Sequence, residues 1–283
     1  MRYYPSNSSV IYRLPQTRLT VFVALLGLMG TLSTGFALAA DPSLYWYSYK
    51  ADSGDNLRGQ SVVRADAKGK IKIAYLAGQN VRYSELDKNQ FTPSVVADTA
   101  IGGDARMDMA LDKDGAPFIL HQDWRYQRVY LAFKTDSKWG NVLVANNRAD
   151  NLDYYSLCLQ VNDAGDVHMA YPLDESGTAF LNYSKRDKEG KLTDPEKLDK
   201  STRNGKWNSM TLDKDGYPII ANYLFGTTSV ALYKKGDSKW DSSAIDTVSS
   251  SGEHGFHSTL VRGADDKYRI AYVHKDRKAL LFA

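Results

Sequence analysis

Aromatic and planar polar side chains recur just before the alternating apolar runs of this chain. Four of them stand at the ends of successive connecting segments: Arg106, Tyr155, Trp207 and His257. An arginine fork donates two parallel hydrogen bonds to a carboxylate, while tryptophan and tyrosine offer flat apolar faces with a polar edge. Such a set, gathered around a shallow opening, suits a sugar or another polar organic molecule.

A loop with the sequence HQDWRY, residues 121–126, adds Trp124 and Arg125, and Asp108 lies in a neighbouring apolar run. Charged loop residues more often pair with one another than with a ligand, whereas an exposed indole needs a packing or a binding reason. We therefore assign no catalytic residue and predict seven ligand-binding residues, which are Arg106, Tyr155, Trp207, His257, Trp124, Arg125 and Asp108.

An internal repeat must position these residues. Residues 109–139, MALDKDGAPFILHQDWRYQRVYLAFKTDSKW, have a close copy in residues 210–240 and weaker copies elsewhere. The turn positions of the five copies are Gly69, Gly115, Gly165, Gly216 and Asp266, so the spacings are 46, 50, 51 and 50 residues. A near-constant period of about 50 residues is typical of propellers and arrays.

The turn of the repeat has the pattern D-x-D-G between two alternating apolar runs. Aspartate and asparagine hydrogen-bond to their own backbone a residue or two further on, and glycine takes a positive φ without steric cost. The pattern predicts a β-hairpin with a three-residue, bulged loop.

Each unit reads as an inner strand, the D-x-D-G turn, a second strand, a loop, a third strand, a turn and an outer strand. The last unit has only three apolar runs, whereas residues 44–49, LYWYSY, alternate with nothing local to pair with. We predict an all-β, five-bladed β-propeller with four-stranded antiparallel blades, in which the N-terminal strand closes the last blade. The predicted blades are residues 60–98, 107–147, 156–200, 208–249 and 258–283 plus 43–50.

The third-to-outer turns 135–139, TDSKW, and 236–240, GDSKW, resemble degenerate Asp-box turns of sialidase-like, BNR-type β-propellers. The repeats resemble that family loosely, only two carry the Asp-x-x-Trp element, and both lack the glycine of the motif. The resemblance implies the propeller fold and a tryptophan packed under each turn. Asp-boxes lie away from the active face in that family, so the resemblance implies little about activity.

Residues 1–39 have the features of a signal peptide, because three arginines precede an apolar run that ends in Ala37-Leu38-Ala39. A membrane anchor is the alternative, since the run approaches the length that spans a bilayer. We expect cleavage, a single domain over residues 40–283, and a secreted or periplasmic monomer. The one cysteine, Cys158, cannot form an internal disulfide.

Composition and motifs exclude several partners. Lys and Arg number 36 against 33 Asp and Glu, and the two signs are interspersed, which is unlike the basic stripe of a nucleic-acid site. D-x-D-G lacks the remaining ligands of a calcium loop, so we predict no metal and no cofactor.

Catalysis on glycans is the alternative at the same opening. A sialidase-like site would need a tyrosine paired with a glutamate, and those loops hold only Glu175 and Glu253. A two-carboxylate glycosidase could use Asp108, Asp123 or Asp174. The sequence has no G-x-S-x-G elbow.

We expect an exported module that binds carbohydrate or another polar extracellular ligand at the channel mouth. The alternatives are a glycan hydrolase or lyase, and a protein-interaction scaffold with a flat, sealed mouth.

Overall fold

The computed structural model of this chain describes residues 48–52, 57–99, 106–123, 128–146, 156–175, 178–198, 203–225, 229–236, 239–244, 254–274 and 278–283. The predicted signal peptide and most of the predicted N-terminal strand lie outside these residues. In the described part, no helix is long and apolar enough to cross a membrane. All the sheets belong to the unit Lys50–Ala283.

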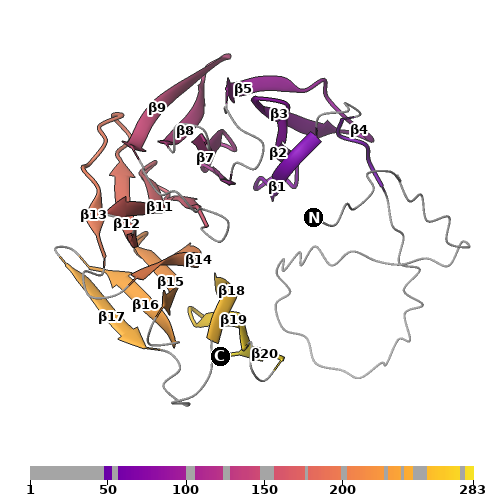
Figure 1. The fold of residues 1–283 in the computed structure, drawn as a ribbon. Coiled ribbons are helices and arrows are strands. Elements are labelled where there is room, and N and C mark those ends of the chain that lie inside the picture. Colours follow the sequence, from indigo (N-terminus) through magenta and orange to yellow (C-terminus); the bar gives the residue numbers. More distant parts are fainter. Residues whose placement is uncertain are drawn as a thin grey trace, which may run out of the picture. The chain divides into compact units, whose positions relative to one another are not determined.

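The strands form five antiparallel sheets that succeed one another in chain order (Figure 1). The first contains β1 (Leu57–Ala65), β2 (Ile71–Ala77), β3 (Asn80–Asp87), β4 (Gln90–Phe91) and β5 (Val95–Thr99), with β4 and β5 both paired to β3. The second contains β6 (Met107–Leu111), β7 (Pro117–Asp123), β8 (Arg128–Thr135) and β9 (Lys138–Asn146). The third contains β10 (Cys158–Val161), β11 (Val167–Glu175), β12 (Thr178–Arg186) and β13 (Glu196–Lys197).

The fourth sheet contains β14 (Arg203–Leu212), β15 (Pro218–Phe225), β16 (Ser229–Lys235) and β17 (Trp240–Ala244). The fifth has three strands, β18 (His254–Arg262), β19 (Tyr268–His274) and β20 (Ala279–Phe282). The predicted all-β class with four-stranded antiparallel sheets is therefore confirmed.

The D-x-D-G turns have the predicted three-residue, bulged geometry. In the second sheet, the Asp112 N–H donates to the Ala116 carbonyl at 3.0 Å, and the Gly115 N–H donates to the Asp112 carbonyl at 3.0 Å. The Asp112 side chain accepts from the Ala116 N–H at 2.7 Å. Gly115 has a φ of 83°, and in the fifth sheet Asp266 adopts the corresponding conformation with a φ of 59°. The local sequence therefore determines the turns.

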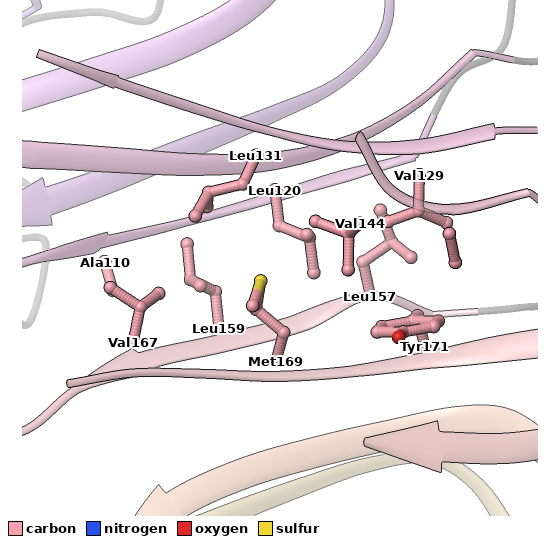
Figure 2. Close-up of a cluster of buried hydrophobic side chains, with 11 residues drawn as sticks. Ala110, Leu120, Val129, Leu131, Val144, Leu157, Leu159, Val167, Met169 and Tyr171 are labelled. Atoms are coloured by element: carbon pink, nitrogen blue, oxygen red, sulfur yellow. The ribbon is translucent and has the colours of Figure 1, made fainter. Parts of the chain in front are cut away.

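The core lies between consecutive sheets. The buried hydrophobic side chains of the described residues form four clusters, each shared by two neighbouring sheets. Figure 2 shows the cluster between the second and third sheets, where Leu120 and Leu131 face Leu159 and Met169. Successive residues of a strand point to opposite faces, so each sheet contributes one set of side chains to the preceding interface and the other set to the next.

Hydrogen bonds between the first strands of neighbouring sheets show how the sheets are oriented. They include Met107 N to Gln60 Oε1 (3.2 Å), Leu159 N to Asp108 Oδ2 (2.9 Å), Gln160 Nε2 to Met210 O (3.1 Å) and Arg262 Nη1 to Leu212 O (3.3 Å). Strand starts bond to starts and strand ends to ends, so β1, β6, β10, β14 and β18 run in the same direction. The turn positions consequently share one side, the turn face, and the strand starts share the opposite side, the mouth face.

Trp139 and Trp240 pack between sheets. Each lies near the start of the last strand of its sheet and meets a tyrosine of the preceding sheet edge-on. The ring centroids of Trp139 and Tyr83 are 5.3 Å apart, and those of Trp240 and Tyr183 are 5.0 Å apart. Both rings take part in the inter-sheet clusters. The packing under the turn that the Asp-box resemblance implied stays a prediction.

The outer faces of the first and fifth sheets differ from the other sheet faces. Six residues before each turn position, Met109, Leu159, Met210 and Leu260 are buried against the preceding sheet, but Val63 of the first sheet is 51% exposed. In the fifth sheet, Leu280 is 74% and Phe282 is 72% exposed. Within the described part of the chain, these two faces therefore expose apolar side chains at positions that are buried in the other sheets.

Candidate functional site

Five residues at one repeat-equivalent position lie near the starts of the inner strands, on the mouth face. The residues nine places before each turn position are Gln60, Arg106, Ser156, Trp207 and His257. Gln60, Arg106, Ser156 and Trp207 form hydrogen bonds to the neighbouring sheet or to the next strand. For example, Asn208 Nδ2 donates to the Ser156 carbonyl at 3.0 Å, and the Ser258 hydroxyl donates to the Trp207 carbonyl.

Trp207 and His257 form an aromatic pair across the fourth and fifth sheets. Their ring centroids are 5.7 Å apart with an interplanar angle of 56°. Tyr223, which is buried, supports Trp207 from the edge, with centroids 5.4 Å apart and an angle of 70°. Trp207 is half-buried and His257 is exposed, so the pair presents ring surface to solvent at the mouth face.

The backbone at both residues has an unusual conformation. Trp207 has a φ of 46° and His257 a φ of 53°, and the pairing register shifts at both places. A positive φ is rare for bulky side chains and costs on the order of 1–3 kcal/mol. Bulges of this kind redirect a side chain and are common next to binding sites. Two equivalent strained bulges therefore direct Trp207 and His257 toward each other.

Asp108 lies on β6 and is occupied by protein partners. Its Oδ1 accepts from Arg64 Nη2 at 2.6 Å, and its Oδ2 accepts from the Leu159 N–H at 2.9 Å. Burial raises the pKa of the Asp108 carboxyl, and the Arg64 guanidinium and the backbone N–H groups of Leu159 and Met109 oppose that rise. Asp108 thus links the first three sheets, a role that its sequence context did not suggest.

Arg106 is half-buried and directly precedes β6, where its carbonyl accepts from the Gln122 N–H at 3.0 Å. Of the other predicted site residues, Trp124, Arg125 and Tyr155 lie outside the described residues. Among the catalytic alternatives, Asp123 is buried. The described residues contain no group of three or more His, Cys, Asp or Glu side chains that could hold a metal ion.

A cavity of about 380 Å³ opens at the start of β1, beside Gln60 and Ser61. Tyr75 lines it and donates from its hydroxyl to Asp52 Oδ2 at 2.6 Å. Burial, with the neighbouring Asp52 carboxylate, raises the pKa of the Tyr75 hydroxyl. Sequence reasoning missed this cavity, although the repeat period marks Gln60 as the counterpart of Arg106, Trp207 and His257.

The succession of up-and-down antiparallel sheets, with parallel inner strands and cores between the sheets, defines a protein of the β-propeller class. No family model and no curated protein matches the sequence. Solved propeller structures do match it. An α-L-arabinanase of Penicillium chrysogenum, complexed with arabinobiose, has a TM-score of 0.56 at 11% identity over 84% of this chain and 80% of that chain.

A fucose-recognising lectin of Aleuria aurantia, described as a six-bladed β-propeller, has a TM-score of 0.52 at 11% identity over 81% of this chain and 75% of that one. A virginiamycin B lyase of Staphylococcus aureus has a TM-score of 0.50 at 12% identity over 81% and 71%. At these identities the similarity shows the fold alone.

Proposed function

We propose that this protein is a binding module for carbohydrate or another polar extracellular ligand, which it takes up at the mouth face. The observation that carries the proposal is the Trp207–His257 pair, with centroids 5.7 Å apart on two strained bulges. An indole face stacks on the apolar face of a sugar ring, and an imidazole offers both a donor and an acceptor to its hydroxyls. The arabinanase and the lectin named above, which share this fold, recognise sugars at sites of their own.

The geometry of Asp108 argues against this residue as a catalytic carboxylate. A glycosidase needs two carboxyl groups that flank the scissile bond, one of them free to give a proton and the other free to attack or to activate water. Both oxygens of Asp108 are engaged, one by Arg64 and the other by the Leu159 N–H. The hydrolase or lyase alternative would have to use carboxylates other than this one.

The proposal includes closure of the ring into five blades. In it, the face of the first sheet that carries Val63 packs against the fifth sheet, and residues 44–49 add a fourth strand beside β20. The exposure of Val63, Leu280 and Phe282 supports this arrangement, since repeat-equivalent residues are buried at the other sheet interfaces.

We also propose that residues 1–39 direct export and are removed, which leaves a monomeric secreted or periplasmic domain.

The test is a glycan-array screen of residues 40–283, followed by a turnover assay on each glycan that binds. Saturable binding without product formation is the expected result. Product release from a bound glycan would favour the hydrolase or lyase alternative. Failure to bind any glycan, together with capture of a protein partner by a flat mouth, would favour the scaffold alternative.

A further inference from the structure

A second cavity lies on the turn face, between the third and fourth sheets and on the side opposite Trp207 and His257. Its volume is about 400 Å³, which is within the range of small-ligand sites. Its walls carry the polar groups of Asn162, His168, Tyr183 and Lys185 from one sheet, and the turn residues Gly216 and Tyr217 from the next. None of these residues belongs to the mouth face.

The equivalent place between the first and second sheets is filled by a lysine side chain. Lys72 is buried, and its ammonium donates to the Gly115 carbonyl and lies 3.7 Å from Asp66 Oδ2 and 4.0 Å from Glu85 Oε1. The two interfaces share their framework, because Tyr83 and Trp139 correspond to Tyr183 and Trp240. The first interface is therefore an internal reference for the second.

At the positions equivalent to that lysine cluster, the third sheet carries different residues. His168 stands where Lys72 does, three residues after the turn position, and Asn162 stands where Asp66 does. Lys185 takes the place of Glu85, since it pairs with His168 as Glu85 pairs with Lys72. The imidazole is shorter than the lysine side chain and is tied back by the Tyr183 hydroxyl, 2.7 Å from its Nδ1. The space beside Gly216 consequently stays open.

Both lysines that line the cavity are already paired with carboxylates, and the exposed carboxylates of Asp194 and Asp215 line it as well. Lys185 Nζ lies 3.0 Å from Asp166 Oδ2, and Lys235 Nζ lies 2.9 Å from Glu196 Oε2. Burial lowers the pKa of His168 to about 4, so its imidazole is neutral at pH 7. An anionic ligand would compete with Asp166 and Glu196 for the two lysines and would also meet the carboxylates of Asp194 and Asp215. A cationic ligand would have to displace a lysine to reach Asp166 or Glu196. A neutral ligand with several hydroxyls can donate to the carboxylates and accept from the ammonium groups without separating either pair.

We propose that this turn-face cavity, formed where His168 replaces the buried Lys72, binds a neutral polyhydroxylated ligand the size of one sugar ring. Tyr217 flanks its entrance with a partly exposed ring, while Asn162 and Tyr183 supply hydrogen-bonding groups. The site is separate from the mouth face. A protein with both sites would hold two segments of a glycan, or two glycans, on opposite sides of the propeller.

The experiment is fluorine NMR on protein labelled with fluorotryptophan. Trp240 lies behind Tyr183 and reports on the turn-face cavity, whereas Trp207 reports on the mouth face. Replacement of each tryptophan by phenylalanine assigns the signals. The probes are the neutral sugars glucose, galactose, mannose, xylose, arabinose and fucose, with glucosamine and glucuronate as charged comparators. We expect at least one neutral sugar to shift the Trp240 signal saturably, and more strongly than either charged comparator.

Two variants connect the shift to the cavity. Tyr217→Ala installs the alanine that the second sheet has at this position, Ala116, and should raise the dissociation constant by about tenfold, as loss of an aromatic contact does. The combined variant Asn162→Asp, Asp166→Lys, His168→Lys and Lys185→Glu reproduces the cluster of the first interface. It should fold, fill the cavity with its own ammonium and abolish the Trp240 shift.

The outcomes separate this site from the mouth-face site. A Trp207 shift without a Trp240 shift would overturn the turn-face site and leave the mouth-face function intact. A Trp240 shift without a Trp207 shift would support the turn-face site and count against the mouth-face function. A Trp240 shift that survives in both variants, or that only a charged comparator produces, would also overturn the turn-face proposal.

Discussion

The Asp108 carboxylate accepts a hydrogen bond from the Leu159 backbone N–H, with 2.9 Å between Oδ2 and the nitrogen. The two residues are one repeat apart and belong to neighbouring sheets. Because the other Asp108 oxygen binds Arg64, one side chain connects three consecutive sheets. This contact shows how the inner strands are held in register by side chain to backbone bonds rather than by strand pairing.

We expect Asp108→Ala to destabilise the protein by about 1–3 kcal/mol, because a mostly buried backbone donor would lose its acceptor and Arg64 its partner. Urea unfolding of the variant measures this loss. Asp163→Ala, in an exposed turn of the third sheet, is the control and should change the stability little. An unchanged unfolding free energy for Asp108→Ala would contradict the role assigned to this contact.

The buried imidazole of His168 predicts a pH dependence of stability. Burial lowers its pKa from the ordinary value of 6.5 to about 4, with a smaller opposing effect of Asp166. Between these values the unfolded chain binds a proton that the folded chain does not, so stability falls as pH drops from 6.5 toward 4. The full contribution is about 3 kcal/mol, from roughly 1.36 kcal/mol per pKa unit.

Urea unfolding at pH 7 and pH 5 should show this loss in the wild type and a smaller loss in His168→Gln. The difference between the two proteins isolates the histidine from the carboxylates that also titrate in this range. Equal pH dependence in both proteins would mean that His168 is not buried as a neutral group.

Trp139→Ala and Trp240→Ala should each cost about 3–5 kcal/mol, since each indole fills space between two sheets. Affinity for a mouth-face ligand should stay unchanged in whatever fraction folds, because both rings lie away from the mouth-face residues. Thermal unfolding and ligand titration of the same samples test the two parts of this prediction. Near-native stability would show that the rings do not fill these interfaces.

Trp207→Ala should weaken ligand binding by about 1–3 kcal/mol, as expected for loss of an aromatic contact at the centre of a site. Its matched control is Ser156→Ala, at the repeat-equivalent position of the third sheet, where no ring is present. Calorimetric titration with a glycan found on the array compares the two variants. Equal affinities would exclude Trp207 from the site.

Deletion of residues 41–50 from the mature protein should yield insoluble protein, because β20 would then present an open sheet edge with exposed Leu280 and Phe282. Solubility and the cooperativity of thermal unfolding measure the effect. The point variant Leu280→Lys in the shortened chain should restore some solubility, since a charge on an edge strand hinders edge-to-edge pairing. A soluble, cooperatively folding deletion variant would argue against closure by this segment.

The sequence by itself determined the features that depend on neighbouring residues. The turn at Asp112–Gly115 follows from an aspartate that accepts from the next turn residues and from a glycine that takes a φ of 83°. Alternating apolar residues on either side produce the strands, and the recurrence of the turn produces five similar sheets. The repeat period also placed Arg106, Trp207 and His257 near the starts of the inner strands.

Tertiary structure alone decided which side chains meet across the sheets. The Trp207–His257 pair depends on two backbone bulges, which the local sequence did not predict. Asp108 became a structural link because the Leu159 N–H, 51 residues away, faces it. His168 and Lys72 occupy the same position of the repeat. Lys72 fills its interface, whereas a cavity remains beside His168. The repeat position alone does not predict this difference, because filling depends on the length and charge of side chains from two sheets at once.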